Sequence, residues 1–473
     1  MPISIRLTTL AVFLPAVLHA QSRTVSNAVR PFVSVEADRV ALTHVRLVDG
    51  TGAVPLDDQT IIIDGERIVA VGNDGEVQIP AGAEEIDLTG HTVLPGIIGL
   101  HDHMYYSSVG GSMKFMPFSY PRLFLGNGVT TIRTTGSVAT YDELNLRASI
   151  EGGQVVGPEI VVTGPYLQGG SPSGLRMHPV SGPEDARRMV RYWAEEGVGW
   201  FKAYNQISRA ELGAAIDEAH KHGVKVTAHL CSVGFREAVA LGIDNLEHGL
   251  LTNSEYWPGK QPDVCPAVPS ADMYGELDVS SDDVQQTISE MVANNVSMTS
   301  TLAVMELSSP SRVPVDQRVL DALFPAAQAS ISNYYEQGRT TDDEASIRVL
   351  QKAMQFERDF VRAGGLLGAG SDPCCVTAMA GFADQRNYEL LVEAGFLPET
   401  AVQIMTLNGA RILGAADRLG SIESGKQADL IIIRGDPTTT PGDIRNVVTV
   451  FRRGLGFDSA TLIESVNGQV GIR

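Results

Sequence analysis

The stretch GIIGLHDHMYY, residues 96–106, ends an apolar run with two histidines, His101 and His103, separated by one residue. Successive side chains on a β-strand point to opposite faces, so this spacing puts both imidazoles on the same face of one strand. Such a pair is compatible with hydrogen-bonded core histidines or with two ligands of one metal ion. The rest of the chain decides between these interpretations.

Short apolar strands alternate with amphipathic helices through the central region, which is typical of parallel βα units. Eight such strands predict an α/β fold, a TIM-type (β/α)8 barrel over residues 93–417. Residues 38–92 and 418–470 instead alternate apolar and polar positions, which predicts a small β-sandwich domain built from both chain ends. The eight candidate strands are 94–103, 129–135, 159–166, 200–204, 225–230, 245–249, 297–302 and 366–372.

Two central helices can be read from local signals. Ser208 and Glu211 form an S-x-x-E capping box, and the helix that follows should stop at Gly223. His220 and His222 lie in its last turn and suit the helix dipole, so we assign them no metal. A second helix is expected within 344–365.

The N-terminus has the features of an export signal. Arg6 precedes an apolar stretch over 7–18, and Ala20 offers a small residue for cleavage, which predicts a signal peptide over 1–20. The apolar stretch is too short to span a bilayer, so no membrane anchor is expected after cleavage. We therefore expect an exported protein, periplasmic or secreted.

Charge and cysteine usage narrow the class of protein further. The 473 residues carry a formal net charge of −20 with no Lys/Arg-rich run, which argues against nucleic acid as a partner. A small-molecule or short-peptide substrate and a homo-oligomer are expected instead. Export permits a disulfide, which we predict between Cys265 and either Cys374 or Cys375, and the alternative is free, packed thiols. The fourth cysteine is Cys231.

Metal-capable side chains stand at or near the C-terminal ends of five of the eight candidate strands. In a parallel barrel these ends converge on one small area, where barrel enzymes hold their chemistry. Six such side chains at the ends of five strands are improbable as a coincidence. The histidines of the first strand are therefore predicted to bind metal. The six residues are His101, His103, Lys202, His229, His248 and Asp372.

The sequence resembles the amidohydrolase superfamily, in its binuclear metal-dependent subtype, over nearly the whole mature chain. The motifs that carry the resemblance are PGIIGLHDHM, FKAY, VTAHL, LEHG, GAGSDP, IMTLNGARILG and GSIESGKQADLIII. The resemblance implies that one metal ion is held by His101, His103 and Asp372. It assigns the second ion to His229 and His248.

The resemblance also implies that Lys202 bridges the two ions. An ammonium group cannot ligate, so the lysine would have to be carboxylated to a carbamate. The other interpretation of Lys202 is a partly buried lysine paired with a carboxylate. The mixed N/O ligand set favours Zn²⁺, although manganese, iron or cobalt are chemically reasonable.

Two divalent ions lower the pKa of a bridging water enough to give hydroxide near neutral pH. Asp372 would accept the hydroxide proton and pass it to the leaving amine. The expected reaction is hydrolysis of an amide or peptide bond in a small substrate, a dipeptide or an N-acyl amino acid, as in exported dipeptidases, carboxypeptidases and prolidase-like members.

Substrate contacts are expected from four residues, two at the ends of the third and fourth strands and two in the segment after the third. Arg176 suits a substrate carboxylate, and His178 can polarise a carbonyl. Tyr166 and Tyr204 stand at strand ends as hydrogen-bond donors, and we group Tyr204 with His178 and Asp372 as catalytic. Packing of the loops and walls is the alternative role for each.

Other functions stay open. A lactone hydrolase, a cyclic-amide hydrolase or a deaminase of the same superfamily is the next alternative. Lys202 counts against deaminases, which usually hold one metal and lack the bridging lysine. A non-catalytic binding scaffold is more remote, because scaffold relatives tend to lose ligands and all six positions are occupied.

Overall fold

A computed structural model describes residues 25–107, 113–170, 177–266, 271–314, 316–338 and 343–472. The predicted signal peptide, residues 1–20, lies outside the described residues, and so does Arg176. Within these ranges no helix combines the length and the apolar composition needed to cross a membrane.

All eight strands expected in the central region are present, arranged in two parallel sheets. The sheets have the orders β11-β10-β7 and β12-β13-β14-β15-β16. An isolated parallel bridge between Thr163 and Trp200 links β11 to β12. The strands are β7 (Ile97–Asp102), β10 (Val129–Thr134), β11 (Glu159–Val162), β12 (Trp200–Ala203), β13 (Lys225–Ala228), β14 (Asn245–Glu247), β15 (Ser297–Ser300) and β16 (Leu367–Ala369).

The segment expected as one strand over 94–103 is divided in two. Its first residues belong to β6 (His91–Pro95), which pairs with β17 in another sheet, and β7 begins only at Ile97. Gly96 makes the transition, and its N–H donates to the Asp429 carbonyl at 2.9 Å. A Cβ at this position would lie 2.1 Å from Thr130 Oγ1, so the close approach of the two segments requires glycine.

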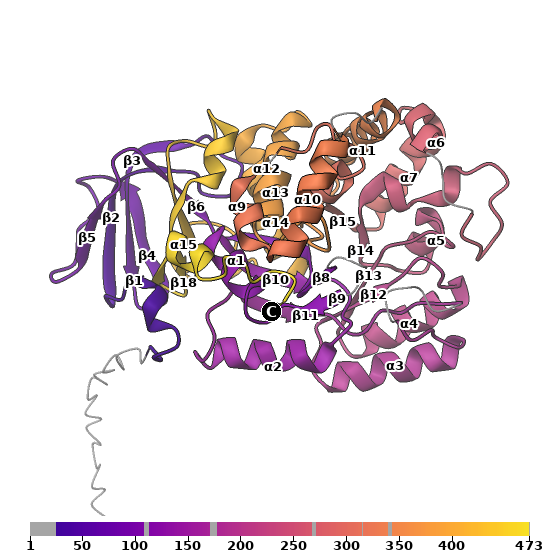
Figure 1. Cartoon of the computed structure of the whole chain (residues 1–473), viewed down its shortest axis with the longest axis horizontal. Coiled ribbons are helices and arrows are strands. Elements are labelled where there is room, and N and C mark those ends of the chain that lie inside the picture. The colour runs from indigo at the N-terminus through magenta and orange to yellow at the C-terminus, as the bar shows by residue number, and fades with distance from the viewer. Residues whose placement is uncertain are drawn as a thin grey trace, which may run out of the picture.

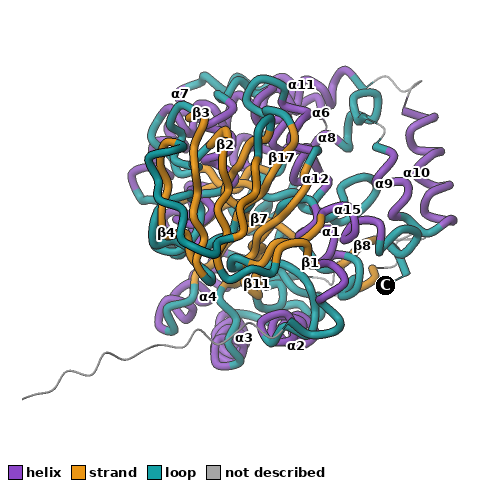
Figure 2. The backbone as a smooth tube through the Cα atoms, turned by 90° about the vertical axis from the view of Figure 1, so that its left-hand side faces the viewer, coloured by secondary structure: helices purple, strands orange, loops and turns teal. Residues whose placement is uncertain are grey.

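Strands from both chain ends share a nine-stranded sheet. Its order is β1-β19-β18-β17-β6-β2-β3-β4, with β5 paired to β2. Figure 2 shows this sheet facing the viewer. The strands are β1 (Val33–Val35), β2 (Arg39–Leu47), β3 (Leu56–Asp64), β4 (Arg67–Asn73), β5 (Glu84–Asp87), β6, β17 (Leu430–Arg434), β18 (Val447–Arg452) and β19 (Leu455–Asp458).

Helices surround the parallel strands, and the nine-stranded sheet lies to their left in Figure 1. Short β8 (Tyr105–Ser107) and β9 (Met113–Phe115) form a separate pair. The helices are α1 (Tyr120–Gly126), α2 (Thr140–Glu151), α3 (Pro183–Glu195), α4 (Arg209–Lys221), α5 (Phe235–Ala240), α6 (Ala271–Glu276), α7 (Asp282–Ala293), α8 (Leu302–Glu306), α9 (Gln317–Ala322), α10 (Pro325–Gly338), α11 (Glu344–Arg362), α12 (Phe382–Glu393), α13 (Pro398–Met405), α14 (Leu407–Leu413), α15 (Ser459–Glu464) and the 3-10 turns η1 (Arg30–Phe32), η2 (Gly249–Thr252), η3 (Ser254–Tyr256) and η4 (Pro441–Arg445).

The local helix signals are confirmed. Ser208 caps α4, with its hydroxyl accepting from the Glu211 N–H while the Glu211 carboxylate accepts from the Ser208 N–H. Gly223 follows the helix at φ +67°, a left-handed conformation that suits glycine after a helix end. His220 bonds Asp244 at 2.9 Å, consistent with a structural role. The second expected helix is α11.

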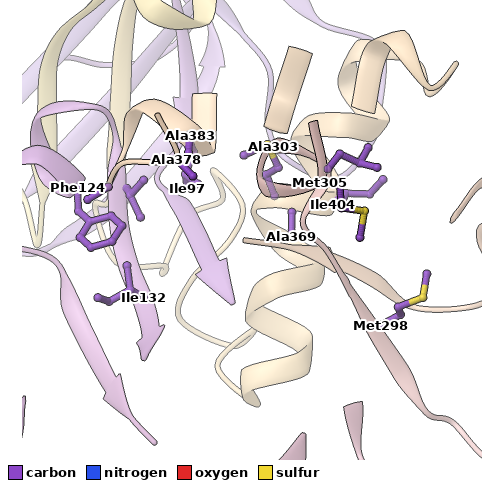
Figure 3. Close-up of a cluster of buried hydrophobic side chains, with 14 of the residues drawn as sticks. Ile97, Phe124, Ile132, Met298, Ala303, Met305, Ala369, Ala378, Ala383 and Ile404 are labelled. Atoms are coloured by element: carbon purple, nitrogen blue, oxygen red, sulfur yellow. The ribbon is translucent and has the colours of Figure 1, made fainter. Parts of the chain in front are cut away.

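A continuous apolar core lies between the parallel strands and the helices. Ile97 of β7 and Ile132 of β10 are buried in it together with Phe124 of α1, and Ala369 of β16 belongs to the same cluster (Figure 3). A second apolar cluster belongs to the nine-stranded sheet and includes buried side chains from β2, β3, β6, β17 and β18. These cores fix the strands whose ends carry the predicted ligands.

The predicted disulfide between Cys265 and Cys374 or Cys375 is wrong. Cys265 pairs with Cys231, with 5.0 Å between their Cα atoms, and Cys374 and Cys375 are free. Residues 260–265 lie against the loop after β13, where Lys260 Nζ donates to the Ser232 carbonyl at 2.7 Å. The loop contact brings Cys265 beside Cys231, which lies 34 residues earlier in the chain.

Candidate metal centre

The two histidines that open the sequence lie at the C-terminal end of β7 and are almost completely buried. Their ring centroids are 5.2 Å apart and the rings meet edge to face. His101 Nε2 is 2.9 Å from Lys202 Nζ of β12. The C-terminal ends of β7 and β12 therefore direct a ring nitrogen and an amine toward one another.

Asp372 follows β16 and reaches both histidines. Its N–H donates to the His101 carbonyl at 2.8 Å, which joins the β16 end to the β7 end. Its Oδ1 lies 3.0 Å from His103 Nε2 and 3.7 Å from His101 Nε2. Its Oδ2 lies 3.9 Å from His248 Nε2. The carboxylate therefore stands among three imidazoles.

The remaining two histidines complete a connected group. The His248 ring centroid is 4.4 Å from that of His101 and 4.7 Å from that of His229. His248 follows β14 at φ +63°, and its Nδ1 is 2.7 Å from Thr301 Oγ1. The structure thus brings together all six side chains that the sequence analysis proposes as ligands.

Burial controls the protonation of this group. Burial lowers the pKa of Lys202 to about 8, and burial together with Lys202 lowers that of His229 to about 3. Burial raises the pKa of Asp372, but the neighbouring imidazoles of His101 and His103 outweigh it and hold that pKa well below its usual range. Neutral imidazoles and an ionised carboxylate are the forms that bind metal.

The donor set fits a divalent cation. One ligand atom from each of His101, His248 and Asp372 lies within 4.8 Å of the others. His248 Nε2 and His103 Nδ1 are buried without a hydrogen-bond partner among the described residues. Buried polar atoms are normally paired, so the unpaired His248 Nε2, 3.9 Å from Asp372 Oδ2, indicates room for a bound group. Imidazole and carboxylate ligands suit zinc.

Two fully buried charged residues behind His101 were missed in the sequence analysis. Glu247 Oε2 is 2.8 Å from His101 Nδ1, and Arg133 Nη2 donates to Glu247 Oε1 at 2.6 Å. The bond fixes a proton on Nδ1 and leaves Nε2 free to bind metal. The available signal was a charged residue inside an apolar strand, since Arg133 interrupts VTTIRTT and Glu247 lies within NLEHG.

Three tyrosines line the same area. Tyr166 and Tyr204 pack edge to face at 5.2 Å, and Lys202 Nζ lies 5.5 Å and 5.8 Å from their centroids. Tyr105, which the sequence analysis does not single out, stacks on the His103 ring at 4.5 Å. Its hydroxyl is 3.0 Å from that of Tyr166. Both predicted tyrosines therefore border the ligand group.

The other two predicted substrate residues lack this support. His178 is exposed, in a segment where the Val180 N–H donates to the Gln168 carbonyl. Arg176 lies outside the described residues. The roles of His178 and Arg176 remain predictions.

Comparisons with known proteins agree with this geometry. A model of the amidohydrolase family matches residues 92–455. Over 119 residues the chain is 30% identical to an S-triazine hydrolase from Gordonia rubripertincta, an alignment that covers 23% of this chain and 24% of that relative. The match to this curated relative thus spans about a quarter of its length.

Two solved structures share the fold. A Xaa-Pro dipeptidase with methionine in its active site is 22% identical, with a TM-score of 0.67 over 89% of this chain and 100% of that chain. A candidate prolidase from Bifidobacterium longum is 27% identical, with a TM-score of 0.65 over 90% and 95% of the two chains. Because the family model spans most of the sequence, the protein belongs to the amidohydrolase family.

Proposed function

We propose that the protein is a metal-dependent hydrolase that cleaves the amide or peptide bond of a small substrate, a dipeptide or an N-acyl amino acid. The observation that carries this proposal is the position of Asp372, whose carboxylate stands among His101, His103 and His248. The similarity to a Xaa-Pro dipeptidase and a candidate prolidase supports a short peptide as substrate.

The proposed cofactor is a pair of divalent ions, zinc by preference. His101, His103 and Asp372 would hold one, His229 and His248 the other, and a carboxylated Lys202 would bridge them. Bound divalent ions supply Lewis acidity and lower the pKa of water. In support, Lys202 is buried, its pKa is lowered to about 8, and its amine faces an imidazole nitrogen at 2.9 Å. A neutral amine is the form that reacts with carbon dioxide.

The chain's own residues would orient the substrate and move its proton. The Asp372 carboxylate would accept a proton from the attacking water and deliver it to the leaving nitrogen. Burial keeps the pKa values of Tyr166 and Tyr204 above their usual range, so both hydroxyls stay protonated and can donate to a substrate carbonyl or carboxylate. His178 and Arg176 are the proposed further contacts.

We further propose that the two parallel sheets close into one (β/α)8 barrel over residues 93–417. The bridge between Thr163 and Trp200 and the hydrogen bond from Asp372 to His101 support closure at both seams. The nine-stranded sheet would form the β-sandwich domain from 38–92 and 418–470, supported by its separate apolar cluster. Export to the periplasm or medium and homo-oligomerisation complete the proposal.

Hydrolysis at a carbon–nitrogen bond of a cyclic or heteroaromatic substrate is the second candidate function. The similarity to the S-triazine hydrolase favours it over other chemistries. A dipeptide places a free carboxylate beside the scissile bond, whereas a triazine does not. Arg176→Ala should therefore impair the first reaction and leave the second intact.

The test is a substrate panel with metal-reconstituted protein. The panel contains dipeptides, N-acyl amino acids, lactones and s-triazines, and Asp372→Asn serves as the inactive control. We expect hydrolysis of amides and two equivalents of metal per chain. Activity confined to lactones or triazines would overturn the proposed substrate class, and one equivalent with full activity would overturn the paired ions.

A further inference from the structure

The segment between β16 and α12 carries two adjacent cysteines, Cys374 and Cys375, just after Asp372. Both are free and partly exposed. The proposed reaction uses neither thiol, although both stand within three residues of its proton carrier.

The four cysteines divide into two kinds of pair. Cys231 and Cys265 are joined, with their Cα atoms 5.0 Å apart, inside the usual range for a disulfide. Consecutive Cα atoms are only about 3.8 Å apart, below the roughly 4.4 Å at which that range begins. A bond between Cys374 and Cys375 would therefore twist the peptide between them, and strained disulfides are the ones most readily reduced again.

The peptide group that would twist is hydrogen-bonded to β8 and adjoins a peptide group that is hydrogen-bonded to Asp372. The Cys374 carbonyl belongs to it and accepts from the Ser107 N–H of β8 at 2.7 Å. The Cys374 N–H donates to the Asp372 carbonyl at 2.7 Å, and the Asp372 N–H donates to the His101 carbonyl. A rotation at Cys374 is therefore transmitted to Asp372 through one hydrogen bond.

The segment is also strained on both sides of the cysteines. Asp372 has φ +47° and Val376 has φ +51°, a conformation that is especially unfavourable for a β-branched residue. Hydrogen bonds from Tyr106 to the Val376 carbonyl at 2.9 Å and from Tyr120 to the Pro373 carbonyl at 3.1 Å hold it in place. Such a segment can relax into a second conformation once one restraint is lost.

We propose that Cys374 and Cys375 form a redox modification site that switches the enzyme off when they are joined as a vicinal disulfide. In this step two S–H bonds break and one S–S bond forms. The two electrons and two protons pass to a small-molecule disulfide, which is reduced to two thiols. The twisted peptide withdraws the Cys374 carbonyl from Ser107 and displaces the Asp372 carboxylate. The loss of activity rests on the proposed function, whereas disulfide formation does not.

The experiment treats the metal-loaded, full-length protein with oxidised glutathione. The tryptic peptide 363–386 contains both cysteines and should lose two hydrogen atoms. Hydrolysis should fall by at least about tenfold, because a displacement near 1 Å can cost about a hundredfold. Hydrogen exchange at the Ser107 amide should rise, and a phosphine reductant should reverse all three changes. Cys375→Ser and, independently, Cys374→Ser should be active and insensitive to the oxidant.

Other results would overturn the modification site, the switch or the proposed function. A peptide that keeps both thiols, or that carries a glutathione mixed disulfide, overturns the modification site. If the vicinal disulfide forms while hydrolysis and hydrogen exchange at the Ser107 amide stay unchanged, the proposed switch is overturned. It is also overturned if the oxidant inactivates both serine variants. If the untreated protein hydrolyses nothing while the disulfide forms and Ser107 exchange rises, the proposed function fails and the redox site is supported.

Discussion

Glu247→Gln tests the residues behind the metal centre. In the native protein the Glu247 carboxylate accepts from Arg133 on one oxygen and contacts His101 Nδ1 with the other. Glutamine keeps the shape but offers one acceptor and one donor. If its NH2 faces His101, Nδ1 must accept and the proton moves to Nε2, which then cannot bind metal. If its NH2 faces Arg133, two donors oppose one another.

The size of the effect follows from burial. The side chains of Arg133 and Glu247 are both 0% exposed and 2.6 Å apart. Removing one partner of a buried ion pair costs about 3 to 5 kcal/mol, because the other charge is left uncompensated. Loss of the bond that orients a ligating histidine costs about 10- to 100-fold in metal affinity. Both losses are expected in the same variant.

The assay combines zinc competition against a chelator with urea unfolding of the metal-free protein. Glu357→Gln is the matched control, because Glu357 is also buried but bonds only the Ser300 hydroxyl, at 3.0 Å, in the described part of the chain. Burial raises the pKa of Glu357 to about 8, so glutamine resembles its neutral form. Zinc affinity in Glu247→Gln equal to that of the control would refute the orienting role of Glu247.

Three further predictions concern the proton carrier, the bridging lysine and a buried acid. Asp372→Asn should lower turnover by about a hundredfold or more with the fold intact, because the amide cannot accept a proton; steady-state rates and circular dichroism check this. Lys202→Ala should lose metal and activity together and regain part of both with acetate or propionate, whereas Lys202→Arg should not respond, since guanidinium stays cationic; metal retained in Lys202→Ala would contradict the bridge. Burial raises the pKa of Glu143 from 4.5 to about 8, so the folded state keeps a proton that the unfolded state loses. The free energy of unfolding should therefore fall as pH rises from about 5 to 8, by up to about 1.4 kcal/mol per pH unit, and Glu143→Gln should flatten this slope in urea titrations.

The convergence of the proposed ligands could be predicted because strand ends are visible in sequence. Each proposed ligand lies at or just after the end of a short candidate strand, and parallel strands direct their C-terminal ends to one area. His229 and His248 come directly after β13 and β14, as the pattern indicates. The capping box of α4 was predictable for a similar reason, since it depends on residues three apart.

The contacts that the sequence analysis missed depend on which strands become neighbours. Glu247 meets Arg133 across 114 residues and His101 across 146, so no local pattern pairs them. The prediction of the disulfide failed for the same reason, because a surface loop brings Cys265 to Cys231 and not to Cys374. Adjacent cysteines and export together suggested a bridge, but neither specifies a partner.

Asp102, the residue between the two histidines, lies on the opposite face of the strand and has a structural role there. Alternation places His101 and His103 on the metal side and Asp102 on the other, where it is 0% exposed. The Ser371 hydroxyl lies 2.9 Å from Asp102 Oδ1 and 3.1 Å from Asp384 Oδ2. One hydroxyl has one proton, so it can donate to only one carboxylate, and bonding both requires that the other carboxyl be protonated.

Burial favours the protonation of one of these two carboxyl groups, since it raises the pKa of Asp384 to about 6 and that of Asp102 well above its usual range. The bond to Ser371 then ties β7 to the residue immediately before Asp372. A register shift of one residue in β7 would therefore turn both imidazoles away from the metal side and break this connection. The opening HDH triplet thus supplies two proposed ligands and, through Asp102, a restraint on the segment that carries the third proposed ligand.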